Sequence, residues 1–336
     1  MHMKFGIIGS GSWATALAKI LTDGKNNINW WIRNTDTINY FQERNHNPHY
    51  LSKAYFEKDT ITLSDSIHYV IENSDVLVIA VPSAYIQDVF SSLNTDVFKN
   101  KKIISAVKGL LPEKNLLLSE YLVKEFSFPL KDYYAVLGPC HAEEVSAEKL
   151  SYLTFSGMNT DMAKQLSIHF ETTYTNTIIN GDIKGVQYAA VLKNIYALGA
   201  GIAHGLDYGD NFLSVYIANS ANEMVRFLRK AKIDLHTTED IINYAASVYL
   251  GDLLVTCYSL YSRNRTFGNM IGKGYSVRSA QLELNMVAEG YNASRCVFDI
   301  NKKVKAEIPI ADNIYKILWE HLPAKKGFEN IESILI

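Results

Sequence analysis

The stretch KFGIIGSGSWATALAKIL, residues 4–21, decides the fold of this chain. The short apolar run Phe5–Ile8 precedes two glycines, Gly9 and Gly11, and apolar residues at helical spacing follow them. The order strand, glycine-rich turn and helix is typical of a dinucleotide-binding sheet. Gly9 permits the tight turn. Gly11 lets the backbone approach a pyrophosphate, whose charge the N–H groups of the following helix would face.

Ala14 stands where the motif G-x-G-x-x-G has its third glycine. That glycine serves the close packing of helix on strand rather than phosphate contact, and alanine is an accepted variant there. Trp13, just before it, is expected to pack at the rim of the loop. The sequence therefore predicts dinucleotide binding although the last glycine is missing.

The first half of the chain continues to alternate strand-like and helical patterns. Further strand-like runs occupy residues 29–32, 60–63, 76–81, 102–107 and 133–137. Residues 76–81 are apolar on both faces, as in a buried parallel strand. From Asp182 onward the periodicity is almost only helical. We therefore predict a doubly wound, mostly parallel Rossmann domain at 1–181 and an all-helical substrate-binding and catalytic domain at 182–336.

The overall composition excludes several classes of protein. The chain has 336 residues, enough for two cores, and a formal net charge of −2. This balance argues against nucleic acid or an anionic membrane as partner. The longest apolar stretch, 186–206, is interrupted by Lys193, Asn194 and His204, which a membrane span would rarely accept.

The cysteine pattern indicates a reducing compartment. Cys140, Cys257 and Cys296 lie far apart with no C-x-x-C spacing. This argues against a disulfide framework and a zinc site, and we predict no metal site. We expect a cytoplasmic protein.

The residue after the second strand bears on the choice of dinucleotide. Arg33 lies 24 positions after Gly9, where an NAD-selective protein usually has an acid for the ribose hydroxyls. An arginine can instead pair with the 2′-phosphate of NADP. Asp36 nearby keeps NAD open, so the sequence favours NADP without deciding between the two.

Two other strand ends carry candidate ligand-binding groups. Lys108 directly follows the fifth strand and is positioned to meet an anion or a carbonyl, or else is a surface lysine. In GPCHAEEV, residues 138–145, a Cys140–His141 nucleophile or metal site is disfavoured because adjacent residues rarely point at each other. We expect the turn to bring backbone N–H groups to a ligand at the start of a helix.

Lys193 interrupts an apolar helical pattern. Burial disfavours the charged form of a lysine, which suits a general acid or base near neutral pH. A dehydrogenase needs such a group because hydride leaves carbon while the hydroxyl gives up its proton. The alternative is a lysine that extends along the helix to solvent. Asn194 beside it argues against a purely structural role, because two adjacent polar residues interrupt the apolar pattern.

A second polar cluster lies at residues 251–274. Asp252 sits among apolar residues, so its burial would require a partner, and a lysine is the natural one. The turn SRNR, residues 262–265, offers guanidinium groups and neutral donors together, a density that suits phosphate. The alternative is an exposed basic loop.

These segments together resemble the bacterial NAD(P)-dependent sn-glycerol-3-phosphate dehydrogenases. The match runs through nearly the whole chain, in GSGSWATALA, VPS, VKGL, GPCHAEEV, VLKNIYALGAG, GDLLVTC, SRNRTFG and AEGYNAS. The resemblance implies a cytoplasmic homodimer that interconverts glycerol 3-phosphate and dihydroxyacetone phosphate with NAD or NADP. It also implies that the product supplies glycerophospholipid synthesis.

The resemblance also implies roles for single residues. Lys193 would transfer the proton and Asp252 would support it. The predicted cofactor-binding residues are Gly9, Gly11, Ser12, Trp13, Arg33, Lys108, Ala142, Arg263, Val287 and Glu289. The predicted substrate-binding residues are Lys108, Gly138, Cys140, Lys193, Asp252, Ser262, Arg263 and Asn264. Cys140 stands where relatives have serine or threonine, and a thiol is a weaker donor.

Two other functions fit part of the pattern. A hydroxyacid dehydrogenase or ketoacid reductase shares the fold plan and a helical-domain lysine, but the SRNR turn favours a phosphorylated substrate over a carboxylate. A non-catalytic dinucleotide sensor would need the glycine-rich turn but neither Lys193 nor Asp252 in a buried polar arrangement.

Overall fold

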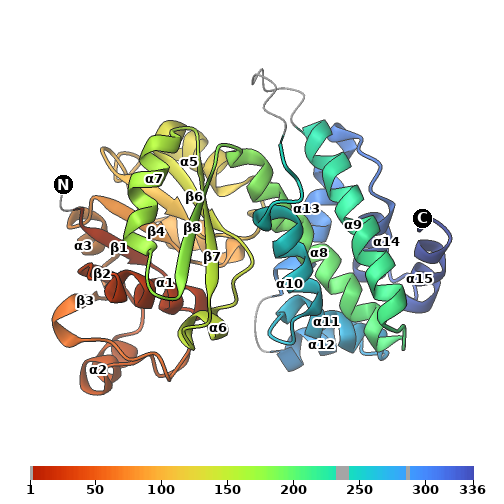
Figure 1. Ribbon diagram of the computed structural model, residues 1–336, viewed down its shortest axis with the longest axis horizontal. Helices are drawn as coiled ribbons and strands as arrows, with labels where there is room; N and C mark the ends of the chain where they lie inside the picture. Colours follow the sequence, from red (N-terminus) through yellow and green to blue (C-terminus); the bar gives the residue numbers. More distant parts are fainter. Residues whose placement is uncertain (1–2, 232–241, 285–287) are drawn as a thin grey trace. The chain divides into compact units, whose positions relative to one another are not determined.

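The computed structural model describes residues 3–231, 242–284 and 288–336 and divides the chain into two compact units. The first unit consists of Met1–Val107 and Leu116–Ile183, and the second of Lys108–Asn115 and Lys184–Ile336. Figure 1 shows a sheet with helices in the first unit and a bundle of helices in the second. Residues 108–115 cluster with the second unit, although they precede residue 182 in the sequence.

The first unit is built on one eight-stranded sheet. Its strands are β1 Phe5–Ile8, β2 Ile28–Trp31, β3 Ile61–Ser64, β4 Val76–Ile79, β5 Lys102–Ser105, β6 Tyr133–Leu137, β7 Ser151–Gly157 and β8 Thr175–Asn180. Their order is β3-β2-β1-β4-β5-β6-β7-β8, and the first six are parallel. This is the doubly wound order, so the predicted Rossmann sheet is confirmed.

Two strands were not predicted. β7 pairs antiparallel with β6, and β8 runs parallel to β7. Ser151, Thr154 and Ser156 of β7 are buried although they are polar. A buried strand with this composition does not give the continuous apolar run that identifies β4 in the sequence.

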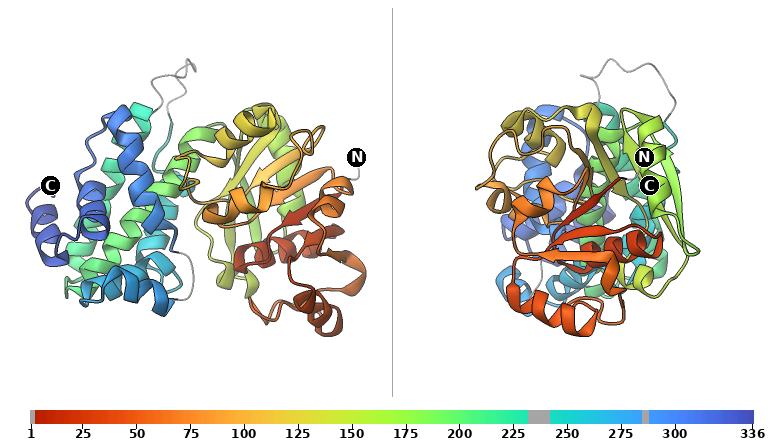
Figure 2. Two further views of the ribbon diagram at one scale, coloured as in Figure 1. Left: turned by 180° about the vertical axis from the view of Figure 1, so that it is seen from behind. Right: turned by 90° about the vertical axis from the view of Figure 1, so that its left-hand side faces the viewer.

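Helices line the sheet both in the view of Figure 1 and in the opposite view of Figure 2. They are α1 Ser12–Asp23, α2 Thr35–Arg44, α3 Ile67–Glu72, α4 Ile86–Phe90, α5 Leu118–Phe126, α6 Ala142–Ser146 and α7 Thr160–Ser167. β1 and β4 are buried along their whole length. The glycine-rich turn therefore starts from the centre of the sheet.

From Lys184 onward, the regular elements of the second unit are all helices among the described residues, whereas residues 108–115 form turns. Its helices are α8 Ile183–Gly205, α9 Asp210–Ala231, α10 Asp252–Tyr258, α11 Arg263–Gly272, α12 Val277–Leu284, α13 Glu289–Val304, α14 Pro309–Trp319 and α15 Ala324–Glu332. Every residue of α8 from 185 to 203 is buried, so α8 is the core helix of this unit. Among the described helices, none is both long and apolar enough to cross a bilayer.

Glycines set the contact between α8 and α11. A Cβ atom on Gly201 would overlap the carbonyl oxygen of Arg265, and one on Gly268 would overlap that of Leu198. The two backbones therefore touch directly. This close crossing holds the helix that carries Lys193 against the helix that begins with the SRNR turn.

Candidate active site

The predicted site residues fall into two groups, one in each unit. The first group surrounds the glycine loop, which we define as residues 9–13. The second surrounds Lys193 and Asp252. Each group is described within its own unit.

The two glycines of the loop have different local roles. Gly9 has φ +125°, and a Cβ there would lie 2.6 Å from the carbonyl oxygen of Ala80, so only glycine fits. Gly11 has φ −77° and ψ −177°, which any residue adopts, and a Cβ there would meet nothing within 4 Å. The space in front of Gly11 is open, as close approach of a ligand requires.

The start of α1 completes the loop. Ser12 and Trp13 are the first two residues of α1, where backbone N–H groups have no acceptor within the helix. Ala14 is fully buried in the core of the unit. Its position agrees with the packing role expected for the third motif position.

Arg33 is exposed just beyond β2. Asn34 caps α2, because its side chain accepts a hydrogen bond from the N–H of Thr37 at 3.1 Å. Asp36 lies exposed in the first turn of α2, where an acid complements the helix dipole. Asp36 thus has a structural role, whereas no described contact gives one to Arg33.

The Gly-Pro-Cys turn follows β6. Gly138 has φ +132°, and a Cβ there would lie 2.8 Å from the carbonyl oxygen of Tyr152. The Cys140 thiol donates a hydrogen bond to that same carbonyl oxygen at 3.2 Å. The Cys140 N–H donates to the carbonyl oxygen of Gly138 at 2.8 Å. Ala142 then begins α6. The thiol therefore helps to hold the turn.

Lys193 and Asp252 form a buried ion pair in the second unit. Lys193 is 3% exposed in the middle of α8, and Asp252 is 1% exposed at the start of α10. The Lys193 Nζ donates to Asp252 Oδ1. The other carboxylate oxygen, Oδ2, is buried and has no hydrogen-bond partner among the described residues. The pairing expected from the sequence is present, and the catalytic roles of the two residues stay predictions.

The backbone before Asp252 is unusual. Ser247–Gly251 form a π-helical turn, a feature that is frequent at functional sites. Tyr249 in this turn is buried and packs edge-on against Tyr244, with ring centroids 5.3 Å apart. Tyr249 therefore fills the core beside the turn that precedes Asp252.

A chain of side-chain amides joins four segments around this pair. Asn194 donates to the carbonyl oxygen of Lys108 at 2.8 Å. Asn264 donates to Asn194 Oδ1 at 2.9 Å and accepts from the N–H of Gly290 at 2.9 Å. The predicted residues Lys108 and Asn264 are thus brought together beside α8. Asn194 was not predicted as a site residue, although a second polar residue beside Lys193 was the available signal.

The SRNR turn and the late predicted residues lie in the same unit. Ser262 caps α11, accepting from the N–H of Arg265 at 3.3 Å. Arg263 is exposed in the first turn of that helix. Glu289 is half-buried at the start of α13, next to Gly290. Val287, predicted to contact the cofactor, lies outside the described residues.

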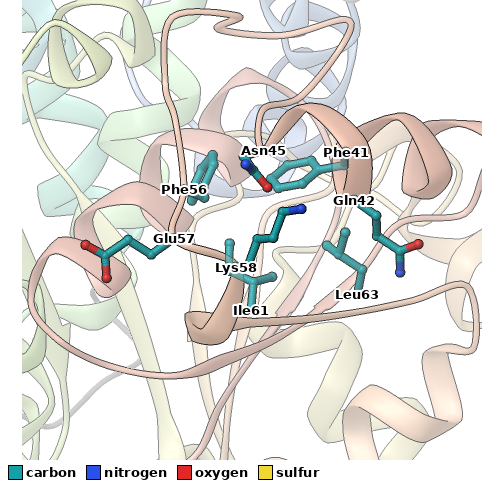
Figure 3. Close-up of a pocket in the computed structure, with 8 residues that line it drawn as sticks. All are labelled: Phe41, Gln42, Asn45, Phe56, Glu57, Lys58, Ile61 and Leu63. Carbon is teal, nitrogen blue, oxygen red and sulfur yellow. The ribbon is translucent and has the colours of Figure 1, made fainter.

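Figure 3 shows a pocket of about 240 Å³ in the first unit. Phe41, Asn45 and Phe56 lie along one side of it, Ile61 and Leu63 along the other, with Lys58 between them. None of the residues that line it is a predicted site residue. The pocket therefore adds no group to the candidate site.

Comparison with known proteins identifies the family. The family model for the N-terminus of NAD-dependent glycerol-3-phosphate dehydrogenase matches residues 4–163, and the model for the C-terminus matches residues 182–329. The chain belongs to this family. This membership confirms the predicted family. It also confirms that the protein is an oxidoreductase and that its cofactor is a nicotinamide dinucleotide.

Individual relatives support this assignment. The chain is 30% identical to the glycerol-3-phosphate dehydrogenase [NAD(P)+] of Bacillus pumilus (strain SAFR-032), over 99% of this chain and 94% of the relative. It is 31% identical to that of Chlorobium limicola (strain DSM 245 / NBRC 103803 / 6330), over 97% and 96%. The crystal structure of glycerol-3-phosphate dehydrogenase from Coxiella burnetii superposes with a TM-score of 0.88 at 26% identity, covering 98% of both chains.

The alternative dehydrogenase class shares the fold alone. A structure of D-mandelate dehydrogenase has a TM-score of 0.59 at 14% identity, covering 97% of this chain and 99% of the other. A ketopantoate reductase from Ralstonia eutropha JMP134 has 0.59 at 13%, covering 97% and 100%. Likeness at these identities carries no argument about the substrate.

Proposed function

We propose that this protein interconverts sn-glycerol 3-phosphate and dihydroxyacetone phosphate by hydride transfer with NAD(P). The observation that carries the proposal is the buried Lys193–Asp252 pair in a chain of this family. Burying two charges carries a desolvation cost, so a buried ion pair often makes the fold less stable than an apolar pair would. A role in proton transfer accounts for a pair in that position.

The residues of the glycine loop fit a dinucleotide. The open space before Gly11 admits a pyrophosphate, and the first N–H groups of α1 face its charge. When bound, the nicotinamide supplies the acceptor or donor of hydride. Ser12, Trp13 and Ala142 would also line the cofactor, as would Lys108, Arg263, Val287 and Glu289. The exposed guanidinium of Arg33 supports a preference for NADP, whose 2′-phosphate it can bind.

Lys193 moves the proton in this account. During oxidation the hydride leaves C2 of glycerol 3-phosphate, the C2 hydroxyl gives its proton to Lys193 Nζ in its neutral amine form, which becomes the ammonium, and the carbonyl forms. During reduction the Lys193 ammonium returns that proton to the C2 oxygen. Asp252 Oδ1 fixes Nζ and balances its charge, while Oδ2 is a buried acceptor that a substrate hydroxyl can use.

The start of α11 would hold the phosphate of the substrate. Arg263 is exposed in the first turn, and a helix N-terminus attracts anions. Asn264 donates one amide hydrogen to Asn194 and keeps a second, because its NH₂ group has two. Ser262 positions the turn as its cap. Lys108, Gly138 and Cys140 would complete the substrate contacts.

Three further properties of the proposal rest on the family resemblance. The enzyme would act in the cytoplasm, assemble as a homodimer and supply glycerol 3-phosphate for glycerophospholipid synthesis. Analytical ultracentrifugation of the full-length protein tests the homodimer.

A substrate screen tests the proposed reaction. Oxidation of NADPH and NADH would be followed with dihydroxyacetone phosphate, pyruvate and ketopantoate. We expect kcat/KM for dihydroxyacetone phosphate to exceed that for either keto acid by about a hundredfold or more, because the proposed donors at the start of α11 would hold a phosphate group. Faster turnover of a keto acid would favour the hydroxyacid dehydrogenase class. Tight NADPH binding with no turnover of any substrate would indicate a sensor.

A further inference from the structure

Three consecutive carbonyl groups of the glycine loop are held from behind by side chains. Each accepts a hydrogen bond from a different side-chain donor. These bonds are Trp30 Nε1 to the Gly9 oxygen at 2.7 Å, Asn47 Nδ2 to the Ser10 oxygen at 3.0 Å and Thr15 Oγ1 to the Gly11 oxygen at 3.0 Å. Trp30, Asn47 and Thr15 are all fully buried.

Asn47 is the centre of this arrangement. Its Nδ2 also donates to Thr15 Oγ1 at 3.0 Å, and its Oδ1 accepts from the N–H groups of His49 at 3.0 Å and Tyr50 at 3.2 Å. Both amide hydrogens and both lone pairs of the side chain are therefore used. This fixes the orientation of the amide, with its NH₂ group toward the glycine loop.

Trp30 is also fixed in position, by ring contacts and by one hydrogen bond. Its ring packs against Phe41 and Phe56, with centroid distances of 5.4 and 5.7 Å. The indole N–H can only donate, and a buried donor without an acceptor is costly. The Gly9 carbonyl is its acceptor, so the ring and the loop fix each other.

The planarity of the peptide bond gives this arrangement a consequence. In a trans peptide, the C=O of one residue and the N–H of the next point in opposite directions. Holding the carbonyls of Gly9, Ser10 and Gly11 from behind therefore turns the N–H groups of residues 10, 11 and 12 to the other side of the loop. These are the groups that a pyrophosphate at the loop would meet.

We propose that Trp30 and Asn47 are positioning residues for dinucleotide binding. They set the direction of the loop N–H groups before the ligand arrives, so binding does not have to supply the cost of ordering them. The inference rests on the proposed role of the glycine loop. It adds two residues that do not themselves contact the ligand.

Two variants of the full-length protein test the inference. Asn47→Asp keeps the acceptor for His49 and Tyr50 but replaces the NH₂ group by an oxygen, and Trp30→Phe removes only the indole donor and part of the ring. Asn45→Asp is the matched control, because it makes the same charge change two residues away in a half-buried side chain that follows α2. NADPH binding is measured by fluorescence titration, alongside kcat, both KM values and the melting temperature.

We expect both variants to raise the Kd and KM for NADPH by roughly tenfold, as expected for the loss of a buried hydrogen bond, with much smaller changes in kcat and in KM for dihydroxyacetone phosphate. The control should bind like the wild type. A folded Asn47→Asp or Trp30→Phe variant with wild-type affinity would overturn the role of that residue. Equal losses in kcat and both KM values would reduce the role to general stability. If either variant fails to fold, the other decides the inference.

Gly11→Val separates this inference from the proposed function. The backbone of Gly11 and the open space around its Cα accept a valine, whose side chain would then occupy the ligand space. We expect a normal melting temperature and no NADPH binding. Wild-type binding by Gly11→Val would refute the loop as the site. Loss of binding there, with normal binding by the other two variants, would refute only the positioning role.

Discussion

The Lys193 side chain lies in a helix whose residues 185–203 are all buried. A lone buried ammonium would be very costly, and Asp252 Oδ1 supplies the opposite charge. Removing one partner of such a pair typically costs about 3 to 5 kcal/mol, because the other charge stays buried. Activity lost on mutating either residue must therefore be read together with the stability of the variant.

The choice between NADP and NAD is a property of one side chain in this account. Arg33→Ala should raise the Kd for NADPH about tenfold, because it removes a charge-assisted contact to the 2′-phosphate. The Kd for NADH should change less than twofold by the same reasoning. Parallel titrations with both dinucleotides measure this.

Arg44→Ala is the matched control. Arg44 is exposed in the last turn of α2, and its substitution removes one positive charge, as Arg33→Ala does. It should leave both affinities unchanged. An Arg33→Ala variant with undiminished NADPH affinity would remove the reason for favouring NADP.

Residue-level prediction from the sequence succeeded where burial dictates a partner. Asp252 was expected beside a lysine because an acid among apolar residues needs one, and the pair is present. Asn194 and Asn47 were not predicted as site residues. Their roles depend on contacts with Lys108 and Ser10, which are far away in the sequence and come close only in the fold.

At the level of elements, α9 and α14 are joined by a buried acid. Glu223 of α9 accepts hydrogen bonds from the N–H groups of Ile310 at 2.8 Å and Ala311 at 2.9 Å, which satisfies the first turn of α14. Tyr196 of α8 donates to the same carboxylate at 3.2 Å. Burial raises the pKa of Glu223 to about 7, and the hydrogen bonds only partly offset this rise.

The raised pKa of Glu223 makes stability depend on pH. Between pH 4.5 and about 7 the folded protein keeps a proton on Glu223 that the unfolded chain has released. Stability from this group therefore falls as pH rises through that window. In urea unfolding, the stability difference between wild type and Glu223→Gln should shift by about 1 to 3 kcal/mol toward the variant from pH 5 to pH 7.5.

Because both proteins share every other titrating group, the comparison isolates Glu223. The lost hydrogen bond in Glu223→Gln adds an offset that does not depend on pH. A stability difference that is the same at pH 5 and pH 7.5 would contradict the raised pKa.

The side-chain pattern of each strand decided whether the sequence predicted it. β1 and β6 have the predicted limits, because each is an apolar run next to glycine, proline or charged residues. β7 was missed because its buried face includes Thr154 and Ser156, and β8 because all its residues after Thr175 are exposed or only partly buried. The predicted strands 76–81 and 102–107 end two residues earlier, at Ile79 and Ser105, since the chain leaves the ladder while still buried.

On the scale of the whole molecule, the two groups of predicted site residues lie in different units. The first holds the glycine loop, which we propose binds the dinucleotide, and the second holds the Lys193–Asp252 pair and the SRNR turn. The alternation of strands and helices before residue 182 and the helical pattern after it predicted this plan. The sequence did not show that residues 108–115 join the second unit, because that depends on the bond between Asn194 and Lys108 and on neighbouring contacts.

The central claim is that Lys193 transfers the proton during turnover. The most direct measurement is the kcat for reduction of dihydroxyacetone phosphate by NADPH in Lys193→Met, with Lys184→Met on the same helix as control. Melting temperature and NADPH titration establish that each variant is folded and that its glycine loop is intact.

We predict that Lys193→Met loses about a hundredfold or more in kcat, the usual contribution of a positioned acid–base group, while it still binds NADPH. Lys184→Met should keep wild-type turnover. A folded Lys193→Met protein that binds NADPH and turns over dihydroxyacetone phosphate at nearly the wild-type rate would contradict the account.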